Sequence, residues 1–311
     1  MSFNTKKFIF KAIIGIKKQV GSQKALCAIS GGVDSTTCAV LAHKAIGKKL
    51  VSVFLDDGLM RDRDEKEIVS VGKKMAIPIK VVRVGKRFFA ALSGKLDPEE
   101  KRIAFRETFY RVLGETVAQY DCQYLIQGTI AADIIETKGK IKTQHNVLTQ
   151  IGIDTKRYGF RVIEPLKTLY KPQVRKVAKA LGLPRQIFAR MPFPGPGLAA
   201  RVIGEVTAEK VATERAATKI IEEELDSLCP FQCFAVLLND RATGMVKGKR
   251  LLGQIIVIRS VDSQDAITAS PTKIPWQTLV KITQRITGEI PGVVKVLYDL
   301  TPKPPSTIEY I

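Results

Sequence analysis

Seven consecutive residues, Ser30 to Thr36, carry side chains and backbone groups that could bind the phosphates of a nucleotide. They read SGGVDST, follow the apolar stretch 25–29 and precede a helix predicted at 37–45. The two glycines let backbone N–H groups approach an anion closely, and the start of the helix adds a partial positive charge. Three hydroxyl side chains add donors, whereas Asp34 would repel phosphate unless a divalent cation lay between them. The loop therefore predicts a magnesium–nucleotide site.

The stretches after this loop alternate between strand and helix patterns. Short apolar runs predict strands, and longer charged segments predict helices. The strands are expected at 50–55, 79–84, 124–127 and 161–163, and the helices at 62–75, 98–120 and 173–181. This βαβ rhythm is typical of a doubly wound parallel sheet, in which ligands bind at the carboxyl ends of the strands.

A segment rich in proline and glycine, residues 191–198, interrupts this rhythm. Because such a segment ends regular structure, we expect a first domain at 1–190 and a second at 191–311. The second part has an α+β pattern. Its helices are expected at 207–228 and 275–286, and its strands at 234–238, 251–259 and 293–298.

The composition limits the classes of protein to which the chain can belong. Its 311 residues suffice for two domains, and no apolar run approaches the ~20 residues that span a bilayer. The N-terminal region is rich in lysine and lacks the apolar core of a secretion signal, so we expect a cytoplasmic protein. No CxxC pair is present, which indicates free thiols rather than a zinc site. The five cysteines are Cys27, Cys38, Cys122, Cys229 and Cys233.

The net charge is +20, from 50 Lys and Arg against 30 Asp and Glu. Such a surface attracts anions, which include nucleotides, nucleic acid and acidic proteins. The basic residues are spread along the chain and do not form one arm or tail. A solvated basic surface and a surface for an acidic partner or RNA both remain open.

The loop SGGVDST resembles that of the N-type ATP pyrophosphatases, which adenylate an oxygen and let a nucleophile displace AMP. Further segments make the resemblance more specific, and together they cover nearly the whole chain. The chain is similar to the synthetase part of the GMP synthetase family, in the split arrangement in which a separate subunit carries the glutaminase. The segments are DPEEKR (97–102), YLIQGT (124–129), PFPGPGLAARVIGEVT (192–207), FAVLL (234–238) and KPPSTIEY (303–310).

The resemblance implies a fold, an activity and partners. The fold is α/β, a doubly wound parallel sheet of the adenine nucleotide alpha hydrolase-like ATP pyrophosphatase type, with a smaller C-terminal α+β domain that dimerises and binds XMP. The activity is a ligase reaction in which ATP adenylates XMP and ammonia converts it to GMP, with release of AMP and pyrophosphate. The implied cofactors are ATP and Mg²⁺. The implied partners are XMP, a glutamine amidotransferase subunit and a second copy of the chain, with no membrane and no nucleic acid.

The resemblance also assigns roles position by position. Asp34 and Lys171 are implied to be catalytic, and Asp34 is also the implied metal ligand. Arg102, Lys303 and Glu309 are implied to bind XMP. An arginine can fork the phosphate, a lysine adds a point charge, and a glutamate accepts from purine N–H groups. The implied ATP-binding residues are Ser30, Gly31, Gly32, Val33, Asp34, Ser35, Thr36, Leu55, Gly128 and Thr129.

Plainer roles remain open for several of these residues. Lys171 could be an ordinary lysine at the start of a helix. Arg102 could pair with Glu99 or Glu100 along one helix face. The C-terminal segment 303–310 could be a rigid, proline-pinned tail at a dimer interface.

Two loops depart from the family pattern, and two acidic residues have no settled role. The segment around His145 lacks a second histidine and two glycines, and Gly248 stands where an aspartate would contact XMP. Asp133 and Glu136 could hold metal or ribose, or could cap a helix. Two other hypotheses follow. One is a diverged ATP pyrophosphatase that acts on tRNA or another nucleotide acceptor. The other is a non-enzymatic subunit that binds nucleotide and regulates a partner.

Overall fold

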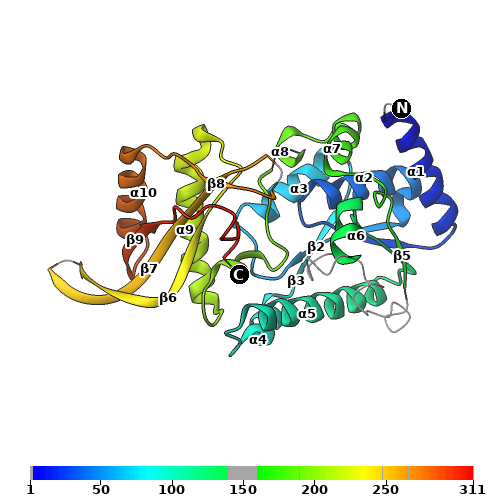
Figure 1. Ribbon diagram of the computed structural model, residues 1–311. Coiled ribbons are helices and arrows are strands. Elements are labelled where there is room, and N and C mark those ends of the chain that lie inside the picture. Colours follow the sequence, from blue (N-terminus) through cyan, green and yellow to red (C-terminus); the bar gives the residue numbers. More distant parts are fainter. Residues whose placement is uncertain (1–2, 139–159, 189, 247, 265, 311) are drawn as a thin grey trace. The chain divides into compact units, whose positions relative to one another are not determined.

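The computed structural model describes residues 3–138, 160–188, 190–246, 248–264 and 266–310 (Figure 1). The chain divides into two compact units. The first comprises residues 1–57, 62–84 and 106–190, and the second comprises 58–61, 85–105 and 191–311. Two segments that precede residue 190 in the sequence thus pack with the C-terminal part. The assignment of nucleotide chemistry to one domain and of XMP binding to the other stays a prediction.

The first unit is built on a five-stranded parallel sheet with the order β3-β2-β1-β4-β5. The strands are β1 (Ala25–Ala28), β2 (Leu50–Asp56), β3 (Ile79–Arg83), β4 (Tyr124–Ile126) and β5 (Arg161–Ile163). The chain leaves β1 toward β2 and β3, and later returns to β4 on the other side of β1. The carboxyl ends of β1 and β4 therefore meet where the strand order reverses, which is the usual ligand site of such sheets.

Helices cover both faces of this sheet, so the predicted doubly wound α/β fold is confirmed. In Figure 1, α2 and α3 lie on one side of the sheet and α5 lies on the other. The helices are α1 (Thr5–Val20), α2 (Val33–Ile46), α3 (Asp64–Lys74), α5 (Pro98–Gln119), α6 (Ala131–Lys138), α7 (Lys171–Ala180) and α8 (Arg185–Phe188). Of these, α5 begins in the second unit and passes into the first at Arg106.

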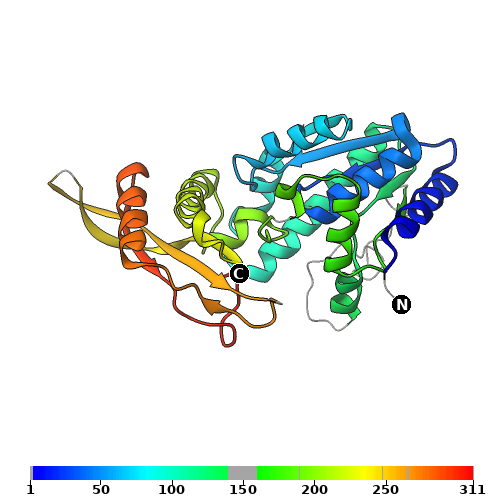
Figure 2. The ribbon, with the colours of Figure 1, turned by 90° about the horizontal axis from the view of Figure 1, so that it is seen from above.

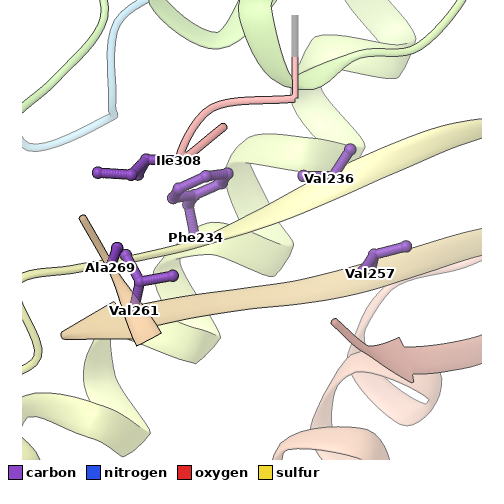
Figure 3. Packing of buried hydrophobic residues seen from close by; sticks show 6 residues of the cluster. All are labelled: Phe234, Val236, Val257, Val261, Ala269 and Ile308. Carbon is purple, nitrogen blue, oxygen red and sulfur yellow. The ribbon is translucent and has the colours of Figure 1, made fainter. Parts of the chain in front are cut away.

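The second unit contains a mixed sheet in which β7 is central. It pairs antiparallel with β6 and β8 and parallel with β9. The strands are β6 (Gln232–Val246), β7 (Lys249–Asp262), β8 (Ser270–Pro271) and β9 (Val293–Tyr298), and the helices are α4 (Gly85–Leu92), α9 (Ala208–Leu225) and α10 (Trp276–Glu289). Helix α9 packs on β6 and against α10. Figure 3 shows part of the core, where Phe234, Val236, Val257, Val261, Ala269 and Ile308 pack together.

Several elements differ from the sequence-based expectations. Strands β6 and β7 extend well beyond the predicted 234–238 and 251–259 and form one long hairpin, visible in Figures 1 and 2. The outer half of β6 is rich in exposed polar residues, among them Asn239, Asp240 and Arg241, so the sequence showed no apolar strand pattern there. Helices α1 and α4 were not expected. The side chain of Asn4, which accepts from the Lys7 backbone N–H at 2.9 Å, caps α1.

Candidate active site

The segment from Ser30 to Thr36, here called the phosphate loop, follows β1, and its last four residues form the first turn of α2, which begins at Val33 and thus earlier than the predicted residue 37. Gly31 has φ +81°, a left-handed conformation that favours glycine. Hydroxyl groups close the loop on itself. Ser35 Oγ lies 3.1 Å from Ser30 Oγ and accepts from the Ser30 backbone N–H at 3.3 Å. Thr36 Oγ1 donates to the Gly32 carbonyl at 2.8 Å. These hydrogen bonds fix the shape of the loop at the N-terminus of α2, where backbone N–H groups can receive an anion.

Gly128, two residues after the end of β4, approaches this loop very closely. A Cβ atom at this position would lie 2.9 Å from both the Asp34 carbonyl carbon and the Ser35 backbone nitrogen. Only glycine allows the segment after β4 to come this close to the first turn of α2 without a shift of backbone. The next residue, Thr129, is buried and donates from Oγ1 to Glu164 Oε1 at 2.7 Å. The predicted ATP-binding stretches around residues 30–36 and 128–129 are therefore adjacent.

Asp34 and Lys171, far apart in the sequence, form an ion pair. Lys171 Nζ lies 2.6 Å from Asp34 Oδ2. The other oxygen, Asp34 Oδ1, is buried and has no hydrogen-bond partner among the described residues. A carboxylate oxygen without a partner suits a hard divalent cation such as Mg²⁺, which takes oxygen ligands. Lys171 is the first residue of α7, so the start of this helix brings its ammonium group to the loop.

A second cation at the phosphate loop was not predicted from the sequence. A Cβ atom on Gly31 would lie 2.3 Å from Arg190 Nη1, so the Arg190 guanidinium packs directly on the loop. Arg190 also pairs with the fully buried Asp64, and its Nη2 lies 3.8 Å from Glu67 Oε2. No periodicity or motif marks Arg190, which only precedes the Pro-Gly segment. Its contact with the phosphate loop arises only in the folded chain, where residue 190 lies beside Gly31.

The three predicted XMP-binding residues each have partners within the second unit. Arg102 Nε donates to Glu99 Oε2 at 3.0 Å, the pairing that the sequence left open. Lys303 Nζ donates to the Ala266 carbonyl at 2.7 Å. Glu309 accepts two hydrogen bonds from Arg201 and one from Gln232. Among the described residues, these three side chains hydrogen-bond to other groups and not to one another.

The remaining predicted positions are placed as follows. Leu55 is buried in β2. Asp133 Oδ2 accepts from the Ile130 backbone N–H at 2.8 Å, which matches the helix-capping alternative. Gly248 lies in the turn of the β6–β7 hairpin with φ +75°. The segment around His145 and the side chain of Glu136 lie outside the described residues.

Cysteines and membrane segments offer no competing site. All five cysteines are free thiols, and four of them are buried. Burial raises the pKa of the Cys27 thiol to about 12, which keeps it protonated at neutral pH. In the described part of the chain, no group of three or more His, Cys, Asp or Glu side chains could hold a metal ion. None of the described helices combines the length and the apolar character needed to cross a membrane.

Comparisons with known proteins match both parts of the chain. A family model described as NAD synthase matches residues 7–198, and one described as GMP synthase C terminal domain matches residues 219–310. The B subunit of the glutamine-hydrolyzing GMP synthase of Archaeoglobus fulgidus is 49% identical over 308 residues, which cover 99% of each chain. Its counterpart in Methanocella arvoryzae is 50% identical over 304 residues, which cover 97% of this chain and 98% of that one.

The chain belongs to the family of GMP synthase B subunits. Membership confirms the predicted resemblance, and with it an ATP-using ligase. A solved structure of NMN synthetase from Francisella tularensis covers 63% of this chain and 78% of its own, at 19% identity and a TM-score of 0.49. That likeness is too distant to bear on function. The residue roles within the family of GMP synthase B subunits stay predictions for this chain.

Proposed function

We propose that the chain adenylates the 2-oxygen of XMP with ATP and then aminates C2 with ammonia to give GMP. In the first step the XMP oxygen attacks the α-phosphorus of ATP and pyrophosphate leaves. In the second step ammonia attacks C2, and the oxygen departs with AMP. The observation that carries the proposal is the phosphate loop packed against Gly128 at the reversal of the strand order, within a chain whose relatives are named as GMP synthase B subunits.

The charged groups of the phosphate loop would act on the leaving pyrophosphate. The N-terminus of α2 would bind the phosphates through backbone N–H groups. Lys171 would exchange its bond to Asp34 for a pyrophosphate oxygen and offset the charge that develops there. Asp34 would hold Mg²⁺, which neutralises phosphate charge when bound. The orphaned Asp34 Oδ1 supports this assignment.

XMP recognition would use residues of the second unit. Arg102 would turn its fork from Glu99 to the XMP phosphate, and Lys303 would add a second positive charge. Glu309 would accept from a ring N–H of the purine. The pair of Arg102 and Glu99 is partly exposed, and such pairs stabilise a protein only slightly, so its exchange for a phosphate costs little free energy.

Two partners belong to the proposal. The names of the relatives contain the word "glutamine-hydrolyzing" and designate a B subunit, which supports a separate glutamine amidotransferase subunit as the source of ammonia. A homodimer is supported by large apolar side chains exposed on the second unit, among them Trp276, Leu297 and Leu300. Light scattering of the purified chain would measure this association.

The test is pyrophosphate release from ATP and Mg²⁺ with ammonium present, measured with and without XMP, together with chromatography for GMP. We expect release that depends on XMP and equals GMP formation. Lys171→Met is expected to lower the rate about 100-fold, as for loss of one transition-state charge contact. Lys176→Met is the matched control, because Lys176 is an exposed lysine of the same helix. Release that ignores XMP, or that appears only with tRNA, would overturn the proposal.

A further inference from the structure

Two side chains without a predicted role hold the carboxylate of Glu309. Arg201 donates from Nε to Oε2 and from Nη2 to Oε1, both at 3.1 Å, as a bidentate fork. Gln232 donates from Nε2 to Oε1. We call Arg201, Gln232 and Glu309 the C-terminal carboxylate cluster. All three residues lie in the second unit.

Arg201 is itself fixed by its surroundings. It ends the 3₁₀ helix η3 (Gly197–Arg201), and its side chain is only 2% exposed. The guanidinium carbon lies 4.0 Å from the centre of the Phe234 ring and 5.1 Å from that of the Phe193 ring. Cation–π contacts with two rings restrain the orientation of the guanidinium group. Because Phe234 belongs to the core of Figure 3, the fork is built on the core of the unit.

The backbone around Glu309 is anchored on the same core. The preceding residue, Ile308, belongs to the buried cluster of Figure 3. Arg259, which is fully buried, donates to the carbonyl oxygens of Thr307 at 2.8 Å and Thr301 at 2.6 Å. The main chain of Glu309 is thus tethered by its neighbours, and the position of its carboxylate depends on Arg201 and Gln232.

One carboxylate oxygen of Glu309, Oε2, can accept a further hydrogen bond. A carboxylate accepts about four hydrogen bonds, two at each oxygen. Oε1 receives Arg201 and Gln232, whereas Oε2 receives only Arg201 among the described residues. The Glu309 side chain is 21% exposed, so a ligand can reach it. The remaining site on Oε2 can accept a hydrogen bond and cannot donate one while the carboxylate is ionised.

We propose that Arg201 is a positioning residue that presents the Glu309 carboxylate to a ring N–H of the acceptor purine. The inference rests on the proposed function, in which Glu309 binds XMP. Arginine stays protonated, and its bidentate fork fixes the position of the carboxylate before the nucleotide arrives. In some purines the ring nitrogen that faces Glu309 carries no proton, as is the case for N1 of adenine. The lone pair of that nitrogen would then face a lone pair of Glu309 Oε2, and the purine would bind poorly. Specificity for oxo-purine nucleotides is thereby set through Arg201.

The main test is Arg201→Lys, which keeps the positive charge but removes the fork. We expect the KM for XMP to rise about tenfold, while kcat and the KM for ATP change by less than about twofold. Arg285→Lys is the matched control. Arg285 also makes a bidentate pair in the second unit, to Glu289 on α10, with Nε–Oε1 at 2.7 Å and Nη2–Oε2 at 3.3 Å. This control is expected to leave the KM for XMP unchanged.

A cycle with Glu309→Gln separates positioning from a general structural role. Because the amide of that variant no longer carries the charge that the fork orients, Arg201→Lys in its background is expected to change the KM for XMP by less than about twofold. Phe193→Leu is a milder second variant, since Phe193 is only partly buried. It is expected to raise the KM for XMP roughly two- to threefold through the lost ring contact, and again only when Glu309 is present.

The outcomes separate the two proposals. If Arg201→Lys and Phe193→Leu both leave the KM for XMP unchanged, or raise it equally in the Glu309→Gln background, the positioning role is overturned and the proposed function stands. If the unsubstituted chain and Arg285→Lys show no XMP-dependent turnover, the proposed function fails and the positioning role falls with it.

Discussion

The phosphate loop and the C-terminal carboxylate cluster both hold a carboxylate against a cation, but they hold it in opposite ways. Asp34 receives one bond from Lys171, whose side chain is 45% exposed. Glu309 receives two bonds from Arg201, which is buried between aromatic rings. A flexible lysine can leave its partner when phosphate arrives, whereas a buried, forked arginine keeps its geometry. The comparison indicates that the loop is suited to exchange of partners and the cluster to a fixed arrangement.

Removal of the charge on Asp34 should have the largest effect, because it disrupts the proposed exchange of partners at the phosphate loop. Asp34→Asn keeps the shape of the side chain. It removes the negative charge of the proposed metal ligand, which is also the partner of Lys171. We expect the rate of XMP-dependent pyrophosphate release to fall about 1,000-fold, since several kcal/mol of charge stabilisation would be lost. The measurement is a steady-state assay over a range of Mg²⁺ concentrations.

Glu107→Gln is the control for this variant, because Glu107 is an exposed acidic residue of the first unit. It should keep the full rate. If Asp34→Asn kept more than a tenth of the rate at saturating Mg²⁺, Asp34 would not be the metal ligand that we propose.

The close approach of Gly128 to the loop predicts the next largest effect. In Gly128→Ala the new Cβ would lie 2.9 Å from two backbone atoms of the loop, so backbone must move. We expect kcat/KM for ATP to fall by about 10- to 100-fold, because the phosphate-binding groups are displaced. Gly15→Ala in α1 is the control, since a Cβ there meets nothing within 4 Å. Normal ATP kinetics in Gly128→Ala would show that ATP binding at the phosphate loop does not require the close approach of residue 128 to Asp34 and Ser35.

The phosphate loop was predictable because its chemistry lies within seven consecutive residues. The alternation of strands and helices then predicted which strand ends surround it, and the parallel sheet confirms that arrangement. Arg190 escaped prediction because its position depends on the packing of the last residues of the first unit, which no local pattern encodes. The extra helix α4 escaped for a similar reason: the segment 85–105 packs with the C-terminal part, which begins only at residue 191.

The C-terminal carboxylate cluster was predictable only in part. Glu309 was found through a motif, whereas Arg201 and Gln232 were not, because their roles arise from contacts that span 108 and 77 residues. An arginine shortly after a Pro-Gly segment and a glutamine at the start of a strand have many possible partners. Burial is the decisive property here, and sequence patterns report burial for apolar residues far better than for charged ones.

Glu214, which lies near Arg201, offers a test of the fixed arrangement of the C-terminal carboxylate cluster. It lies fully buried on α9, where Thr218 Oγ1 donates to its Oε1 at 2.6 Å. Its Oε2 atom has no hydrogen-bond partner among the described residues. Burial raises the pKa of Glu214 from 4.5 to about 8, although the nearby Arg201 opposes that rise. Near neutral pH the cluster thus borders a carboxyl group that is largely protonated.

This raised pKa predicts an effect on stability and its pH dependence rather than on turnover. Below pH 4.5 Glu214 is protonated in both states, and its contribution to stability is complete. Between about pH 4.5 and pH 8 the unfolded chain loses this proton while the folded chain keeps it, so stability falls by up to a few kcal/mol and then levels off.

Glu214→Gln keeps the acceptor for Thr218 but cannot ionise. Its Tm relative to the unsubstituted chain should therefore rise by several degrees from about pH 5 to about pH 8, measured by differential scanning calorimetry. Glu209→Gln, an exposed position of the same helix, should show no such trend. A Tm difference that stays constant across this pH range would mean that Glu214 is ionised, and that the cluster holds a further buried charge.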